Sequence, residues 1–399
     1  SGLPMKTISG NIVDLHNETV FPGTIHIDNG IITGIDRERY WYDTYVLPGF
    51  VDSHVHVESS MLTPAGFARV AVVHGTVATV SDPHEIANVL GPQGVRFMIQ
   101  DARGIPFTFA FGAPSCVPAS PFETSGAAMD LAETEALLDE EGVGYLSEMM
   151  NVPGVIGGDP DVQAKIDAAI RRGKPVDGHA PGLRGEGLRR YVAAGISTDH
   201  ESFELEEGRE KISLGMKILI REGSAAKNFD TLYPLIAESP DFCMLCTDDQ
   251  HPDSLVKGHI NTLAARAIRK GVDVMKVLRC ACVNPVVHYG LGVGLLRPSD
   301  PADMIVVDSL ENLEVLKTIV RGEIVAEAGE SRIIHRSAAP VNVFRATARK
   351  PEDFRVLKRS DAIRVIGVIE DQVVTYADVE APALLGETVV CDIDRDILK

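Results

Sequence analysis

The stretch LPGFVDSHVHVESSMLTP places two histidines, His54 and His56, at the end of an apolar run that is typical of a β-strand. Side chains two residues apart on a strand point to the same side, so both imidazoles face one spot. Two imidazoles buried together are costly unless a ligand binds both of them. The pair therefore predicts a shared ligand, and other polar groups of the chain must complete the site.

Other predicted strands also end in residues that can bind metals. The groups at these strand ends are Glu148, His179, His200 and Asp248, besides the stretch Asp82-Pro83-His84-Glu85. One such residue alone is usually structural, but six groups aimed at one another would be costly without a cation. We therefore predict two divalent metal ions. Their expected ligands are, for the first ion, His54, His56 and Asp248 and, for the second, His179 and His200, with Glu148 bridging the two.

A pair of divalent ions predicts hydrolytic chemistry. Two ions ~3.5–4 Å apart that share a solvent ligand make hydroxide available near neutral pH. Asp248 could accept the proton of that hydroxide and deliver it to the leaving group, as in hydrolysis of a C–N bond at an electrophilic carbon. Because the set contains carboxylates, Mn²⁺ or Fe²⁺ is favoured, and Zn²⁺ is an alternative.

The elements that must position these residues alternate along residues 47–297. Eight strand patterns are each followed by a helical pattern, with helices expected, for example, over 127–141 and 230–238. Eight such units are the signature of a (β/α)8 TIM barrel of the α/β class, whose active site lies at the carboxyl ends of the strands. A doubly wound open sheet is the alternative, but no glycine-rich phosphate loop follows the first strand.

Short strand patterns flank the barrel on both sides. They occupy residues 1–46 before it and 298–345 after it, and Asp28-Asn29-Gly30 is a strong hairpin signal. Two β-rich flanks of similar character predict one small β-sandwich domain formed by both flanks of the barrel.

Composition narrows the class of protein further. The 38 basic and 57 acidic residues give a formal net charge of −19, which disfavours a nucleic-acid partner and a polybasic membrane contact. The apolar runs fall short of the ~20 residues of a membrane span. The 6 cysteines lack the density of a disulfide scaffold, so we expect reduced thiols in a cytoplasmic protein.

Several motifs then resemble one family in order along the chain. They are HVHVESSMLTP, DPHEIANV, SEMMNVPGV, DGHAPGL, STDHE, IREGSAAKN and CTDDQHPD. The HxH pair is similar to the amidohydrolase superfamily of metal-dependent hydrolases, and DPHEIANV with IREGSAAKN resembles its bacterial adenine deaminases. The resemblance implies that adenine and water give hypoxanthine and ammonia in purine salvage. The family's ligand positions fall on the same six residues that the strand ends indicate.

The resemblance also suggests roles around the substrate. Many relatives that hydrolyse cyclic amides carry a carboxylated lysine where this chain has Glu148. Adenine becomes open to attack when a ring nitrogen is protonated, and Glu85 is our candidate acid, with capping of the following helix as its alternative role. Weaker candidates for binding the purine are His84, Asp249, Glu58, Arg221 and Ser224, and His251 on the polar loop TDDQHPD.

Family members usually continue well beyond the point where this sequence ends. Residues 346–399 are therefore expected to form the start of a C-terminal domain that is truncated here. Three alternatives to an adenine deaminase stay open: a cyclic amidase of the superfamily, a deaminase of another aminopurine, or a non-catalytic relative lacking the C-terminal domain. We expect a small-molecule substrate and a homo-oligomer, with a dimer as the simplest case.

Overall fold

The computed structural model describes residues 6–399, so the first five residues of the expected N-terminal flank lie outside the described part. The chain divides into two compact units, residues 1–339 and residues 340–399. The first unit contains the barrel and the sheet formed by its flanks.

The barrel predicted from the sequence is confirmed. Its parallel strands are β5 (Phe50–Val55), β6 (Thr76–Ser81), β7 (Thr108–Ala113), β8 (Val143–Met149), β9 (Val176–Gly178), β10 (Thr198–Asp199), β11 (Lys217–Arg221) and β12 (Cys243–Cys246). Strands β5 to β9 pair in sequence order, as do β10 to β12. The Ser197 N–H donates to the Val176 carbonyl at 2.9 Å and joins the two sheets. Asp248 closes the ring on β5, because its N–H donates to the His54 carbonyl at 2.8 Å.

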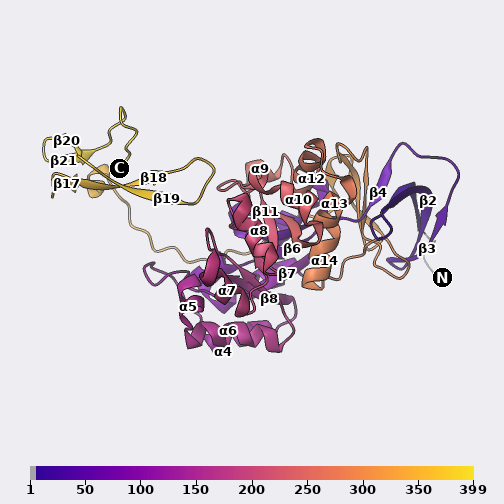
Figure 1. The fold of residues 1–399 in the computed structure, drawn as a ribbon, viewed down its shortest axis with the longest axis horizontal. Coiled ribbons are helices and arrows are strands. Elements are labelled where there is room, and N and C mark those ends of the chain that lie inside the picture. Colours follow the sequence, from indigo (N-terminus) through magenta and orange to yellow (C-terminus); the bar gives the residue numbers. More distant parts are fainter. Residues whose placement is uncertain (1–5) are drawn as a thin grey trace. The chain divides into compact units, whose positions relative to one another are not determined.

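Helices connect the strands and cover them (Figure 1). The α-helices are α1 (Pro64–Ala71), α2 (His84–Leu90), α3 (Pro92–Ala102), α4 (Leu131–Leu138), α5 (Val152–Gly157), α6 (Pro160–Arg171), α7 (Gly185–Ala193), α8 (Leu205–Ser213), α9 (Phe229–Leu232), α10 (Pro234–Glu238), α11 (Pro252–Leu255), α12 (Ile260–Arg269), α13 (Val274–Leu278) and α14 (Asn284–Tyr289). Short 3-10 turns are η1 (Val57–Ser60), η2 (Val72–His74) and η3 (Pro240–Phe242), and η4 (Arg279–Val283) is a π-helical turn.

Two helices differ from their expected bounds for local reasons. The helix expected over 230–238 is divided into α9 and α10, because Pro234 lacks the N–H that a continuous helix needs. The helix expected over 127–141 begins only at Leu131. Asp130 caps its first turn and forms a capping box with Glu133, which fixes the start of α4.

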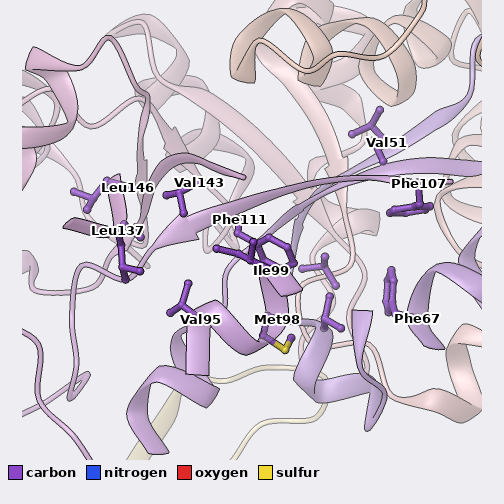
Figure 2. Packing of buried hydrophobic residues seen from close by; sticks show 14 of the residues in the cluster. Val51, Phe67, Val95, Met98, Ile99, Phe107, Phe111, Leu137, Val143 and Leu146 are labelled. Carbon is purple, nitrogen blue, oxygen red and sulfur yellow. The ribbon is translucent and has the colours of Figure 1, made fainter. Parts of the chain in front are cut away.

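The main core lies between the barrel strands and their helices. Figure 2 shows Val95, Met98 and Ile99 of α3 turned toward Phe111 of β7 and Val143 of β8. These side chains are buried, so the apolar stripe of α3 supplies the driving force that holds this helix on the sheet.

Strands from both flanks form one hydrogen-bonded sheet. Its order is β16-β15-β14-β13-β4-β1-β2-β3, with β4 paired parallel to β1 and antiparallel to β13. The strands are β1 (Lys6–Asp14), β2 (Thr19–Asp28), β3 (Ile31–Arg37), β4 (Tyr45–Leu47), β13 (Met304–Val307), β14 (Val315–Val320), β15 (Glu323–Glu327) and β16 (Glu330–Ser331). In Figure 1 the indigo strands near the N-terminus lie beside the orange segment that follows α14. The expected hairpin is present, with Asn29 and Gly30 at φ 49° and 78°.

The second unit is a small β structure. Its elements are η5 (Pro351–Phe354), β17 (Val356–Leu357), β18 (Ile363–Val368), β19 (Thr375–Glu380), β20 (Ala383–Leu385) and β21 (Thr388–Val390). Strands β18 and β19 form a hairpin, and β17, β21 and β20 form a separate sheet. Across residues 6–399, none of the helices has the length and apolar character that crossing a membrane requires.

Candidate metal centre

Three of the expected ligands meet where β12 closes on β5. Nε2 of His54 and Nε2 of His56 lie 3.2 and 3.0 Å from Oδ1 of Asp248. All three side chains are almost completely buried. Asp248 has a φ of 56°, an unusual backbone conformation for a residue other than glycine, and backbone hydrogen bonds to His54 and His56 hold it there. The barrel closure therefore determines where this carboxylate points.

Glu148, near the end of β8, lies between the other ligands. Its Oε2 is 2.6 Å from Nδ1 of His179 and 3.1 Å from Nε2 of His200. Its Oε1 is 3.4 Å from Nε2 of His56, so the two oxygens face the two halves of the expected site. The imidazoles of His54 and His200 stack with ring centroids 3.8 Å apart. The structure thus brings all six expected ligands together, in the two groups that the sequence suggested.

The donor atoms of this cluster fit divalent metal ions. Nε2 of His200 is buried and has no hydrogen-bond partner, although it points into a group of oxygen and nitrogen donors. The Nδ1–H of His56 donates to the Asp82 carbonyl at 3.0 Å, which leaves Nε2 free to bind a metal ion. Imidazoles and carboxylates in such a group are the ligands that zinc, iron and manganese accept.

The electrostatics of the cluster favour ionised carboxylates. Burial would raise the pKa of Asp248, but hydrogen bonds from His54 and His56 hold it well below its usual range. Burial opposes ionisation of Glu148 as well, and the charges of His179 and His200 hold its pKa well below the usual range. Both carboxylates are therefore in the charged form that binds a cation.

Arg221, expected to contact substrate, lies behind the cluster. Its guanidinium is 4% exposed and donates to Oδ2 of Asp248 at 2.5 Å and to both oxygens of Glu201. Burial would lower the pKa of Arg221, but Asp248 and Glu201 raise it above its ordinary value. The structure places this side chain where it supports a candidate ligand.

Glu85 and His84 begin α2 beside the cluster. Oε2 of Glu85 is 3.2 Å from Nδ1 of His56, and the side chain is 38% exposed. Nδ1 of His84 is 3.3 Å from Oε1 of Glu148. No side chain caps the start of α2, and the Ile86 N–H donates instead to Glu58. The contacts of Glu85 are therefore with the site, and the capping role is not observed.

The remaining substrate candidates lie on the neighbouring loops. Glu58 lies on η1, and burial together with the nearby Glu85 carboxylate raises the pKa of Glu58 to about 8. Oδ1 of Asp249 accepts a hydrogen bond from Ser59 at 2.5 Å. Ser224 donates its N–H to the Asp249 carbonyl at 2.8 Å and accepts from the N–H of His251, which is exposed. Ser224, which follows β11, is thus hydrogen-bonded to Asp249 and His251 of the loop after β12.

Sequence reasoning passed over two carboxylates at the cluster. Asp82 is fully buried, with Oδ1 3.3 Å from Nδ1 of His84 and Oδ2 accepting the Glu148 N–H. Oε1 of Glu201 is 3.4 Å from Nε2 of His200. Each stands near a strand end, which marks both as candidates, but their partners come from contacts between strands.

His259, just before α12, is buried and has a structural role. Its Nε2 is 2.8 Å from Oδ2 of Asp52, and its Nδ1 is 2.6 Å from Oγ1 of Thr76. Asp52 in turn accepts the Thr247 N–H at 3.1 Å, one residue before Asp248. His259 and Asp52 therefore link β5 to the residue just after β12 and help to hold the barrel closed.

A (β/α)8 barrel that gathers histidines and carboxylates at the carboxyl ends of its strands is typical of the metal-dependent hydrolases. The model of the amidohydrolase family matches residues 45–325. A protein of Salinibacter ruber named adenine deaminase is 56% identical over 393 residues, which cover 98% of this chain and 72% of that protein. One of the same name from Methanosarcina mazei is 50% identical over 408 residues, covering 99% of this chain and 74% of that protein. The chain therefore belongs to the amidohydrolase family, in the group of its adenine deaminase relatives.

A solved structure supports the fold independently. The β-aspartyl dipeptidase of Fervidobacterium islandicum superposes with a TM-score of 0.63 over 84% of this chain and all of that chain, at 16% sequence identity. The fold and the family resemblance expected from the motifs are confirmed.

Proposed function

We propose that the protein is an adenine deaminase, which hydrolyses adenine to hypoxanthine and ammonia. The observation that carries this proposal is 56% identity to a relative of that name over 98% of the chain. The convergence of six candidate ligands at the strand ends supports it, because their donor atoms lie close enough to bind metal ions together.

The proposed cofactor is a pair of divalent ions, with Mn²⁺ or Fe²⁺ favoured by the carboxylate content. His54, His56 and Asp248 would hold one ion, His179 and His200 the other, and Glu148 both. Divalent ions in such a site lower the pKa of water and supply hydroxide near neutral pH.

The side chains of the protein would then move the protons. Glu85 donates a proton to a ring nitrogen of adenine, which makes C6 more electrophilic. As the bond from water oxygen to C6 forms, Asp248 accepts a proton and passes it to the exocyclic nitrogen. The C6–N bond then breaks and ammonia leaves, and the hydroxyl proton that remains on the C6 oxygen returns to Glu85, which gives hypoxanthine and restores the acid. Arg221 occupies Oδ2 of Asp248, so Oδ1 is the oxygen that faces the histidines.

Orientation of the purine is assigned to polar groups around Glu85. Glu58, His84 and Asp249 lie in the connections after β5, β6 and β12 respectively and can hydrogen-bond the ring nitrogens. Ser224 and His251 would shape the mouth of the site from the adjoining loops.

The proposed setting is a cytoplasmic enzyme, with a homodimer as the proposed assembly. All six cysteines are free thiols, which supports a reducing compartment. The acidic surface supports a free base as substrate in place of a nucleic acid.

The test is a metal-dependent assay with adenine. Chelator-treated protein is reloaded anaerobically with Mn²⁺ or Fe²⁺, and adenine absorbance is followed together with released ammonia. We expect both to change only with metal, and Glu148→Gln to lower turnover at least ~100-fold because the carboxylate shared by both ion sites is lost. The exposed Glu186→Gln variant is the matched control and should turn over adenine normally. Two bound ions without any loss of adenine would rule out the deaminase and point to another cyclic amide or amine.

A further inference from the structure

A fully buried lysine lies outside the candidate metal centre, on helix α8. Lys211 has no exposed surface, and its ammonium is surrounded by oxygen atoms. Nζ donates to the Ala180 carbonyl at 2.7 Å, to Oδ2 of Asp199 at 2.9 Å and to Oε1 of Glu207 at 2.7 Å. The Ser202 hydroxyl is also within 3.0 Å of it. None of these groups has a place in the chemistry proposed above.

The two carboxylates of this group each join the loop after β9 to the loop after β10. Asp199 accepts the Ala180 N–H through Oδ1 and the Ser202 N–H through Oδ2, both at 2.9 Å. Glu207 accepts the Gly182 N–H at 2.8 Å and the Phe203 N–H at 3.1 Å. Lys211 sits between the carboxylates, so one ammonium holds both connections together.

The two loops are the ones that carry His179 and His200. His179 directly precedes Ala180, whose N–H and carbonyl are both bound by the cluster. His200 directly follows Asp199 and lies within the segment that Ser202 and Phe203 anchor. The other expected ligands are held by different groups, since Asp248 is supported by Arg221 and by the barrel closure.

A buried ion cluster usually adds little to the free energy of unfolding. Removing charges from water is costly, and apolar replacements are often neutral or stabilising, so such clusters need another explanation. Positioning is that explanation here, because groups around a metal site orient its ligands.

We propose that Lys211, Asp199 and Glu207 form a positioning cluster that fixes His179 and His200 in the geometry needed to bind the second metal ion. The cluster residues are positioning residues, since they touch the loops and not the reacting atoms. The inference deepens the proposed function and rests on its two-ion site.

The experiment measures Mn²⁺ binding to metal-stripped protein by equilibrium dialysis, with the ion content counted for each chain. Wild-type protein is expected to bind two ions. Lys211→Met should keep the first ion with unchanged affinity and bind the second about 10–100-fold more weakly, the range seen when groups that orient ligands are removed. Glu207→Gln keeps the size of the side chain and the lysine, and it should weaken the same ion to a smaller degree. It carries the test alone if Lys211→Met does not fold.

Two controls separate positioning from general destabilisation. Arg209→Met removes an exposed cation from the same helix, where it pairs with Glu206 and Glu238. Leu235→Ala removes a buried apolar side chain of α10 that lies against Gly208 of α8. Both controls should keep two ions at wild-type affinity.

The inference is overturned if Lys211→Met and Glu207→Gln bind both ions like wild type, or if Leu235→Ala loses the second ion to the same degree. It is also overturned if wild-type protein binds only one ion. Wild-type protein that binds two ions but leaves adenine unchanged would instead overturn the proposed activity and leave the positioning cluster standing.

Discussion

At the scale of single residues, Asp248 shows how one carboxylate is divided between two tasks. Oδ1 faces the imidazoles of His54 and His56, whereas Oδ2 is bound by Arg221. Because Arg221 also pairs with Glu201, one guanidinium neutralises two buried carboxylates. The positive charge of Arg221 therefore stabilises both buried carboxylates, and its hydrogen bond also orients Asp248.

Replacing Arg221 by methionine should leave both carboxylates buried without their counter-charge. Breaking a buried ion pair in this way costs about 3–5 kcal/mol of unfolding free energy, which urea unfolding of metal-free protein will measure. Arg266→Met is the matched control, because that arginine pairs with Glu222 and Asp230 nearer the surface. It should cost only about 0–1 kcal/mol. Equal losses of unfolding free energy in the two variants would show that the buried ion pairs of Arg221 stabilise the fold no more than the surface pairs of Arg266.

At the scale of elements, the sequence was sufficient to predict the barrel and to select six candidate ligands that the fold brings close together. Strand ends could be read from the alternation of patterns, since His54 and Glu148 lie near the ends of β5 and β8 and His179 follows β9. What the sequence could not show is which neighbour turns inward, since Asp82 and Glu201 acquire partners only through contacts between strands. The partners of Arg221 could not be predicted for the same reason, because a cation at a strand end can face either the substrate or the carboxylates beside it.

The junction of β5, β12 and α12 is the element-scale feature that holds the barrel closed. His259, just before α12, contacts Asp52 on β5, and Asp52 binds Thr247 just after β12. His259→Leu would remove one hydrogen-bond partner from buried Asp52 and the partner of the buried Thr76 hydroxyl, at a cost of about 1–3 kcal/mol in unfolding free energy. Because the closure carries Asp248, we also expect weaker binding of the first ion.

Chemical unfolding and Mn²⁺ titration of the same His259→Leu protein check both expectations. His335→Leu is the control, since His335 is exposed and lies outside the barrel. If His259→Leu unfolds at the same urea concentration as His335→Leu, the junction does not hold the closure.

At the scale of the whole molecule, acid should unfold the protein partly through histidines far from the metal centre. Burial, with the nearby Lys217 ammonium, lowers the pKa of His288 to about 4, and burial with His259 lowers that of His74 to about 4. Their unfolded forms bind a proton near pH 6.5. The folded chain therefore binds fewer protons in this range, so stability is complete above pH 6.5 and is lost as the pH falls toward 4.

Each of these two histidines should contribute at most about 3 kcal/mol to that loss, because one pKa unit corresponds to about 1.4 kcal/mol. Urea unfolding of metal-free protein at pH 7 and pH 4.5 measures the difference, and leaving the metal out removes the contribution of metal release at low pH. His288→Gln keeps a polar group opposite Ser197 and should shrink the difference between the two pH values, and adding His74→Gln should shrink it further. His335→Gln should leave it unchanged. A double variant with the full wild-type difference would place the acid sensitivity in the carboxylates of the barrel instead.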